Sequence, residues 1–149
     1  MRRDQLEHAI RTACQITGHD EVIVVGSQAI LGTYPEYELP FLATRSMEVD
    51  ILPITDDNNT TIELADLIVG VAGELSPFEQ LHGFSIDGVD LTTSALPDGW
   101  RDRLVRVQNK NTAVPGATRS TSVGAWTRKT CAWRSCVRSV RRIKILSTR

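Results

Sequence analysis

The chain has no long hydrophobic run and few aromatic residues. No apolar stretch approaches the roughly 20 residues that a membrane-spanning helix needs, and aromatic residues make up only 5% of the chain. The basic residues near the N-terminus are not followed by an apolar segment, so we expect no signal peptide. These features predict a cytoplasmic protein with no membrane partner. Its 149 residues suffice for one domain, or one domain with a tail.

Cysteine is scarce, and histidine is missing where a zinc site would need it. The three cysteines, Cys14, Cys131 and Cys136, are an odd set without the density of a disulfide framework. Cys131 and Cys136 lie close in sequence, but no histidine accompanies them, which argues against zinc. Cys14 falls on the apolar face of a predicted helix, where a core role is expected.

Basic residues are nearly absent from the first two thirds of the chain, and acids from the rest. Residues 1–100 contain 4 Lys/Arg against 17 Asp/Glu, whereas residues 101–149 contain 13 Lys/Arg against the single acid Asp102. The net charge of −1 conceals this division. A basic segment that also carries tryptophans is typical of an arm that binds RNA or DNA.

The hydrophobic pattern predicts helices that alternate with short strands. Apolar residues recur at helical spacing over residues 3–17, and the β-branched run at 22–25 is typical of a buried strand. The further predicted elements are a short helix from Ser27, a strand over 47–52, a helix opened by a capping box at Thr60 and Glu63, a helix capped by Ser76, a hairpin over 84–91 that turns at Asp87-Gly88, and a strand over 104–107. This order predicts an α/β (α+β) fold, with a small mixed β-sheet flanked by helices.

Two carboxylates share one face of the second predicted strand. Residues i and i+2 of a strand project from the same face, so Glu48 and Asp50 point the same way. A third acid, Asp90, lies on a later predicted strand. Carboxylate oxygens and substrate phosphates are the ligands that Mg²⁺ prefers. An acid-x-acid pattern is also typical of a strand face that is exposed to solvent and has no other role.

A Gly-Ser pair follows the first predicted strand. Gly26 and Ser27 lead into a predicted short helix, whose start offers free backbone N–H groups to a phosphate. A Cβ at position 26 would hold the backbone away from such a phosphate. Gly26 and Ser27 are therefore candidate nucleotide-binding residues, although Gly-Ser pairs are also common in ordinary turns.

These motifs together resemble the signature of the nucleotidyltransferase superfamily that includes DNA polymerase β. That signature is an apolar strand ending in Gly-Gly or Gly-Ser, then an acid-apolar-acid-apolar strand, then a third acid on another strand. The matching segments are Val25-Gly26-Ser27, Glu48-Val49-Asp50-Ile51 and Val89-Asp90-Leu91. The longer segments around these motifs, residues 24–32 and 46–52, are similar to a bacterial branch of the superfamily. That branch lies near the nucleotidyltransferase-like proteins of toxin–antitoxin and phage-abortive systems. The resemblance covers roughly residues 1–112, with about twenty residues between Ser27 and Glu48, more than the superfamily usually has.

The resemblance implies an activity and a role for each motif. Glu48, Asp50 and Asp90 would hold two Mg²⁺ ions, and Asp90 would also help to deprotonate the acceptor hydroxyl. Gly26 and Ser27 would hold the phosphates of a nucleoside triphosphate. The implied reaction transfers a nucleotide to a hydroxyl of RNA, such as tRNA, or of a protein, and a cognate toxin or antitoxin is an implied partner.

Residues 113–149 form a basic tail beyond this resemblance. Because the tail has no clean helical stripe, we expect it to be poorly ordered. If the codons of residues 123–149 are displaced by one base, permissive codon choices spell an amphipathic helix of mixed charge, similar to the region that follows the catalytic domain in this family. We therefore hypothesise a frameshift near Pro115 and Gly116. The nucleotide sequence of the gene tests it, since early stop codons in the shifted frame would exclude it.

Two other functions fit parts of the same sequence. The chain can be an inactive remnant or an antitoxin-like module that binds a protein, which a stable complex formed without nucleotide would support. It can also be a nucleic-acid-binding protein that uses residues 101–149, which salt-sensitive binding lost on deletion of the tail would support.

Overall fold

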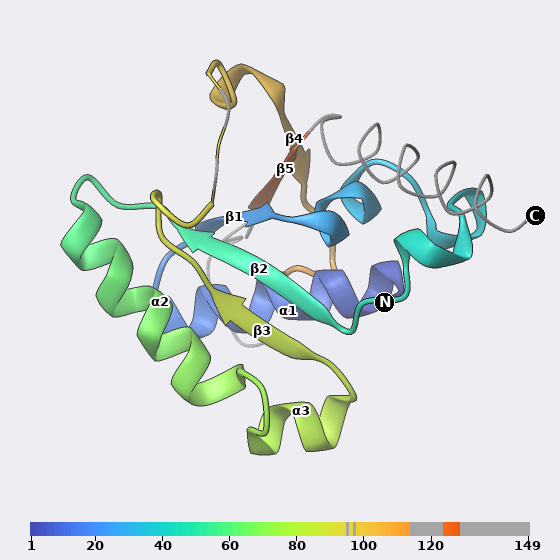
Figure 1. Ribbon diagram of the computed structural model, residues 1–149, viewed down its shortest axis with the longest axis horizontal. Helices are drawn as coiled ribbons and strands as arrows, with labels where there is room; N and C mark the ends of the chain where they lie inside the picture. Colours follow the sequence, from blue (N-terminus) through green and yellow to red (C-terminus); the bar gives the residue numbers. More distant parts are fainter. Residues whose placement is uncertain (95, 97, 114–123, 129–149) are drawn as a thin grey trace, which may run out of the picture.

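The computed structural model describes residues 1–94, 96, 98–113 and 124–128 (Figure 1). The α-helices and strands in this part are α1 (Arg3–Thr17), β1 (Glu21–Val25), β2 (Glu48–Pro53), α2 (Asn58–Ala72), α3 (Pro77–His82), β3 (Ser85–Gly88), β4 (Leu104–Val107) and β5 (Gly124–Arg128). Short 3₁₀ helices η1 (Ser27–Gly32), η2 (Glu36–Glu38) and η3 (Phe41–Ala43) connect β1 to β2, and η4 (Arg101–Arg103) precedes β4. The predicted α/β (α+β) class is confirmed.

The strands of the described residues form one mixed sheet in the order β3-β2-β1-β5-β4. β1 and β2 are antiparallel, with Val25 opposite Asp50, and β2 and β3 are parallel, with Asp50 opposite Asp87. β5 is parallel to β1 and antiparallel to β4. The range that the sequence analysis assigns to a basic tail therefore supplies an inner strand at residues 124–128. The rest of that range, residues 114–123 and 129–149, lies outside the described residues.

Helices α1 and α2 cover one face of the sheet (Figure 1). Alternate residues of β1 and β2 point toward these helices and form the main core with them. This core includes Val22, Val24, Val49 and Ile51 from the strands, with Leu6, Ile10 and Ile68 from the helices. The intervening residues Ile23, Val25 and Leu52 form a smaller apolar cluster on the opposite face. Glu48 and Asp50 share that opposite face with Leu52, because all three alternate with Val49 and Ile51.

The helix ends follow local sequence signals, with one correction. α1 ends at Gly18 with a φ of 69°, and the Ser76 hydroxyl caps α3, as predicted. α2, in contrast, does not begin at a capping box on Thr60. Its N-cap is Asp57, whose carboxylate accepts a hydrogen bond from the Thr60 N–H at 3.0 Å. Aspartate is a better N-cap than threonine, and Asp57 lies three residues earlier in the chain.

The predicted hairpin over residues 84–91 is wrong. Residues 85–88 form β3, a strand parallel to β2, so Asp87 and Gly88 continue the strand instead of turning it. Gly88 has a packing role, since a Cβ there would lie 2.1 Å from the carbonyl oxygen of Ala65. The glycine thus lets β3 pass close to α2. The predicted strand over residues 104–107 is confirmed as β4.

Candidate metal site

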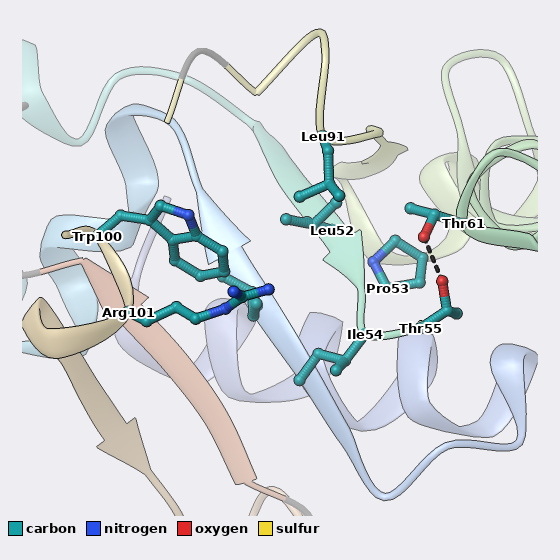
Figure 2. A pocket seen from close by; sticks show the side chains of 9 residues that line it. Leu52, Pro53, Ile54, Thr55, Thr61, Leu91, Trp100 and Arg101 are labelled. Carbon is teal, nitrogen blue, oxygen red and sulfur yellow. Dashed lines mark hydrogen bonds between the residues drawn. The ribbon is translucent and has the colours of Figure 1, made fainter. Parts of the chain in front are cut away.

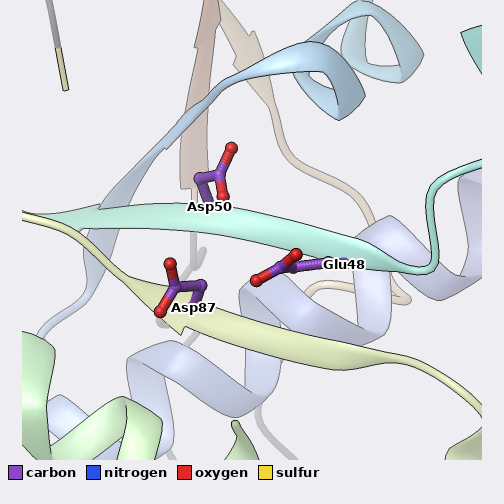
Figure 3. A group of neighbouring side chains, drawn as sticks. All are labelled: Glu48, Asp50 and Asp87. Atoms are coloured by element: carbon purple, nitrogen blue, oxygen red, sulfur yellow. The ribbon is translucent and has the colours of Figure 1, made fainter. Parts of the chain in front are cut away.

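Three carboxylates gather on neighbouring strands at the face of the sheet that α1 and α2 leave uncovered. Glu48 and Asp50 are two residues apart on β2, and Asp87 of β3 stands opposite Asp50 in the parallel register. Figure 3 shows the three side chains grouped across these two strands. One carboxylate oxygen from each residue lies within 4.8 Å of the other two. These three residues, here called the acidic cluster, could hold a metal ion.

Asp90, the third acid expected from the sequence, is not part of the acidic cluster. Its carboxylate stabilises the turn that begins at Asp90 itself, where it accepts hydrogen bonds from the Thr92 hydroxyl at 2.6 Å and the Thr93 N–H at 2.9 Å. These hydrogen bonds lower the pKa of Asp90. Asp87 takes the expected place because the chain runs on as a strand at the point where a hairpin turn was predicted.

Asp87 is absent from the site residues predicted from the sequence, although the sequence contains a signal for it. Ser85, Asp87 and Val89 alternate with Phe84 and Ile86, which is the period of a strand with one apolar face. The strong turn preference of the Asp-Gly pair instead favours a hairpin here. A continuous strand through this segment would have placed Asp87 beside the second predicted strand.

The acidic cluster is electrostatically strained. Burial, followed by the neighbouring charges of Glu48 and Asp87, raises the pKa of Asp50 from 3.8 to about 6. Burial and nearby acids, Asp87 first, also raise the pKa of Glu48. Within the described part of the chain, no Lys, Arg or His forms an ion pair with any of the three carboxylates. A bound cation would relieve this repulsion.

Gly26 and Ser27 lie next to Asp50, because β1 ends where it pairs with the first half of β2. Gly26 has a φ of 70° and a ψ of −162°, a conformation that is essentially restricted to glycine. A Cβ on Gly26 would lie 1.8 Å from Oδ2 of Asp50. Both residues are exposed, and η1 begins at Ser27 as the predicted short helix. The structure thus brings together four of the five predicted site residues, and Asp90 is the exception.

Comparison with protein-family models, with curated proteins and with solved structures gives no match to this chain. Among the described residues, no helix is both long enough and apolar enough to cross a membrane.

Proposed function

We propose that the acidic cluster binds Mg²⁺ and that the protein is a nucleotidyltransferase, which transfers a nucleotide from a nucleoside triphosphate to a hydroxyl of RNA, such as tRNA, or of a protein. The observation that carries this proposal is the meeting of Glu48, Asp50 and Asp87 within 4.8 Å, without a described cation to neutralise them. The resemblance described above supplies the reaction class and the toxin–antitoxin setting.

The donor set fits Mg²⁺. All three side chains present carboxylate oxygens, the hard ligands that Mg²⁺ selects, and no cysteine or histidine among the described residues joins them to favour a softer metal. Glu48 is exposed while Asp50 and Asp87 are partly buried, so one side of the acidic cluster faces solvent, where a substrate can approach. When bound there, Mg²⁺ would neutralise charge on the phosphates of the nucleotide, and the resemblance to the nucleotidyltransferases implies a second ion beside it.

Each neighbouring residue then has a defined task. Asp50 is the central ligand, because it lies between β1 and β3 and touches the space that Gly26 leaves open. Gly26 and Ser27 contact the phosphates from the adjoining strand end. Asp87 replaces Asp90 as the third acid, and we expect its carboxylate to accept the proton of the acceptor hydroxyl.

Calorimetric titration of ATP, GTP, CTP and UTP, each with Mg²⁺, tests this proposal. We expect at least one nucleotide to bind the full chain only when Mg²⁺ is present, and Asp50→Asn to abolish that binding. Asp66→Asn, the same change at an exposed acid on α2, is the matched control and should bind normally. Equal nucleotide binding by Asp50→Asn and the unmodified chain would refute the assigned role.

A protein-binding module is the second candidate, and exposed aromatic residues favour it. Tyr37 and Phe41, in the segment between β1 and β2, are 82% and 79% exposed. Aromatic side chains are enriched in protein–protein interfaces. This candidate predicts a complex with the product of a neighbouring gene that forms without nucleotide and is lost in Phe41→Ser. A complex that requires nucleotide, or that Phe41→Ser leaves intact, would count against it.

A further inference from the structure

The face of the sheet that carries the acidic cluster also carries a cavity. Along β2, the residues that point away from α1 and α2 are Glu48, Asp50 and then Leu52. Leu52 belongs to the small apolar cluster of this face and lines the cavity. Since a strand rises about 3.3 Å per residue, Leu52 lies roughly 7 Å beyond Asp50 along the strand. The acidic cluster and the cavity are therefore consecutive features of one surface.

The cavity has an aromatic wall on one side and aliphatic walls on the other. Figure 2 shows Trp100 and Arg101 facing Leu52, Pro53 and Leu91 across the opening. The Arg101 guanidinium carbon lies 4.9 Å from the centre of the Trp100 ring, a cation–π contact. This contact places the planar guanidinium over one face of the indole.

The size of the cavity limits what can enter it. Its volume of about 50 Å³ exceeds the roughly 10–15 Å³ that one water molecule needs, so it is more than a packing defect. It is too small for a whole nucleotide, and its lining is mixed, because the side chains of Arg101, Thr55 and Thr61 stand beside apolar residues. The Thr55 and Thr61 hydroxyls at its far end are already hydrogen-bonded to each other. A cavity of about 50 Å³ does not enclose a whole ring, so an aromatic ring is accommodated only at its opening, beside Trp100.

We propose that the opening of this cavity receives the aromatic ring of the same ligand whose phosphates a metal ion on the acidic cluster would hold, so that a nucleobase lies against Trp100. The inference rests on the function proposed above and extends it, since it names where the ligand gains affinity beyond its phosphates. Base–aromatic stacking tolerates any base, because every base has a π-face. The arrangement therefore predicts a site that discriminates nucleotides from bare polyphosphate more strongly than it discriminates one base from another.

Two probes test this inference. Both carry a triphosphate group, but only one of them has an aromatic ring. ATP and inorganic tripolyphosphate are each titrated, with Mn²⁺, into the full chain and into Trp100→Ala, Trp100→Phe and Tyr37→Ala. Trp100→Ala should lose about tenfold in ATP affinity and keep its affinity for tripolyphosphate. Trp100→Phe should retain most of the ATP affinity, because it keeps a ring. Tyr37→Ala removes an exposed aromatic residue outside the cavity and should change neither affinity.

The outcomes separate the two proposals. Equal affinities of the unmodified chain for ATP and tripolyphosphate would overturn the cavity assignment and leave the metal site standing. A Trp100→Ala protein that still binds Mn²⁺ but weakens both probes equally, or neither, would overturn it as well. If Trp100→Ala fails to fold, Trp100→Phe decides, since loss of the ATP preference in that variant contradicts a stacking role. Failure of the unmodified chain to bind Mn²⁺ would overturn the proposed function, and this inference with it.

Discussion

Gly26, which follows β1, lies against Asp50 of the neighbouring strand β2. The Asp50 carboxylate occupies the space that a side chain at position 26 would take. A Cβ at position 26 would stand 1.8 Å from Oδ2 of Asp50. The glycine is therefore required twice, by its backbone conformation and by the position of the carboxylate. The relationship links the Gly-Ser motif to the acidic cluster physically, before any ligand is considered.

Gly26→Ala should displace Asp50 and weaken metal binding as well as stability. We expect a loss of about 1–3 kcal/mol in the free energy of unfolding, because the backbone of the alanine must adopt a conformation that only glycine tolerates. Manganese affinity should fall as the carboxylate moves away from Glu48 and Asp87. Chemical denaturation and Mn²⁺ calorimetry measure the two effects.

Gly18→Ala is the control for that substitution. Gly18 also has a positive φ, 69°, but nothing lies within 4 Å of the Cβ that alanine would add. It should lose stability by about 1–2 kcal/mol and keep its full Mn²⁺ affinity. If both alanine variants bind Mn²⁺ equally well, the contact between Gly26 and Asp50 has no bearing on the metal site.

Stability should depend on pH through Asp50. Because its pKa is about 6 in the folded protein and 3.8 in the reference state, the folded protein retains a proton that the unfolded chain has released between these values. The free energy of unfolding should therefore fall as pH rises from about 4 to about 6 and change little above that through this group. Asp50→Asn removes this contribution.

The test compares the melting temperatures of the metal-free unmodified protein and Asp50→Asn at about pH 4 and about pH 7. The melting temperature of the variant, relative to that of the unmodified protein, should be higher at about pH 7 than at about pH 4, because Asp50 is then charged beside Glu48 and Asp87. A difference between the two proteins that is the same at both pH values would show that Asp50 ionises normally.

The sequence and the structure assign the N-cap of α2 to different residues, and mutation can tell the two apart. A capping box on Thr60 predicts that Thr60→Ala destabilises the helix, whereas the structure gives the cap to Asp57. Asp57→Ala should lower the melting temperature more than Thr60→Ala, because it leaves a helix N–H without a partner. Asp57→Asn should retain most of the stability, since asparagine also caps. The reverse order of Asp57→Ala and Thr60→Ala would restore the sequence-based interpretation.

The parts of the fold that the sequence predicts are those whose signals are local. The apolar stripe of α1, the β-branched run of β1 and the alternation of β2 each lie within one segment, and each element forms as expected. Glu48 and Asp50 could be paired from sequence because they share a strand. Gly26 could be marked because it follows a strand directly.

The parts that the sequence does not predict depend on pairing between distant segments. Asp87 joins the acidic cluster only because β3 lies parallel to β2 in a register that no local pattern specifies. β5 likewise pairs with β1 across about a hundred residues, from within a range whose charge suggested a separate tail. The cavity at Trp100 forms where the segment before β4 meets Leu52, again a contact between remote residues.

The most direct test of the acidic cluster is Mn²⁺ calorimetry on three proteins, the unmodified chain, Asp87→Asn and Asp90→Asn. The two variants make the same chemical change three residues apart, one inside the acidic cluster and one outside it. We predict that the unmodified chain and Asp90→Asn bind Mn²⁺ alike and that Asp87→Asn binds at least about tenfold more weakly. Loss of binding in Asp90→Asn with normal binding in Asp87→Asn would contradict the account.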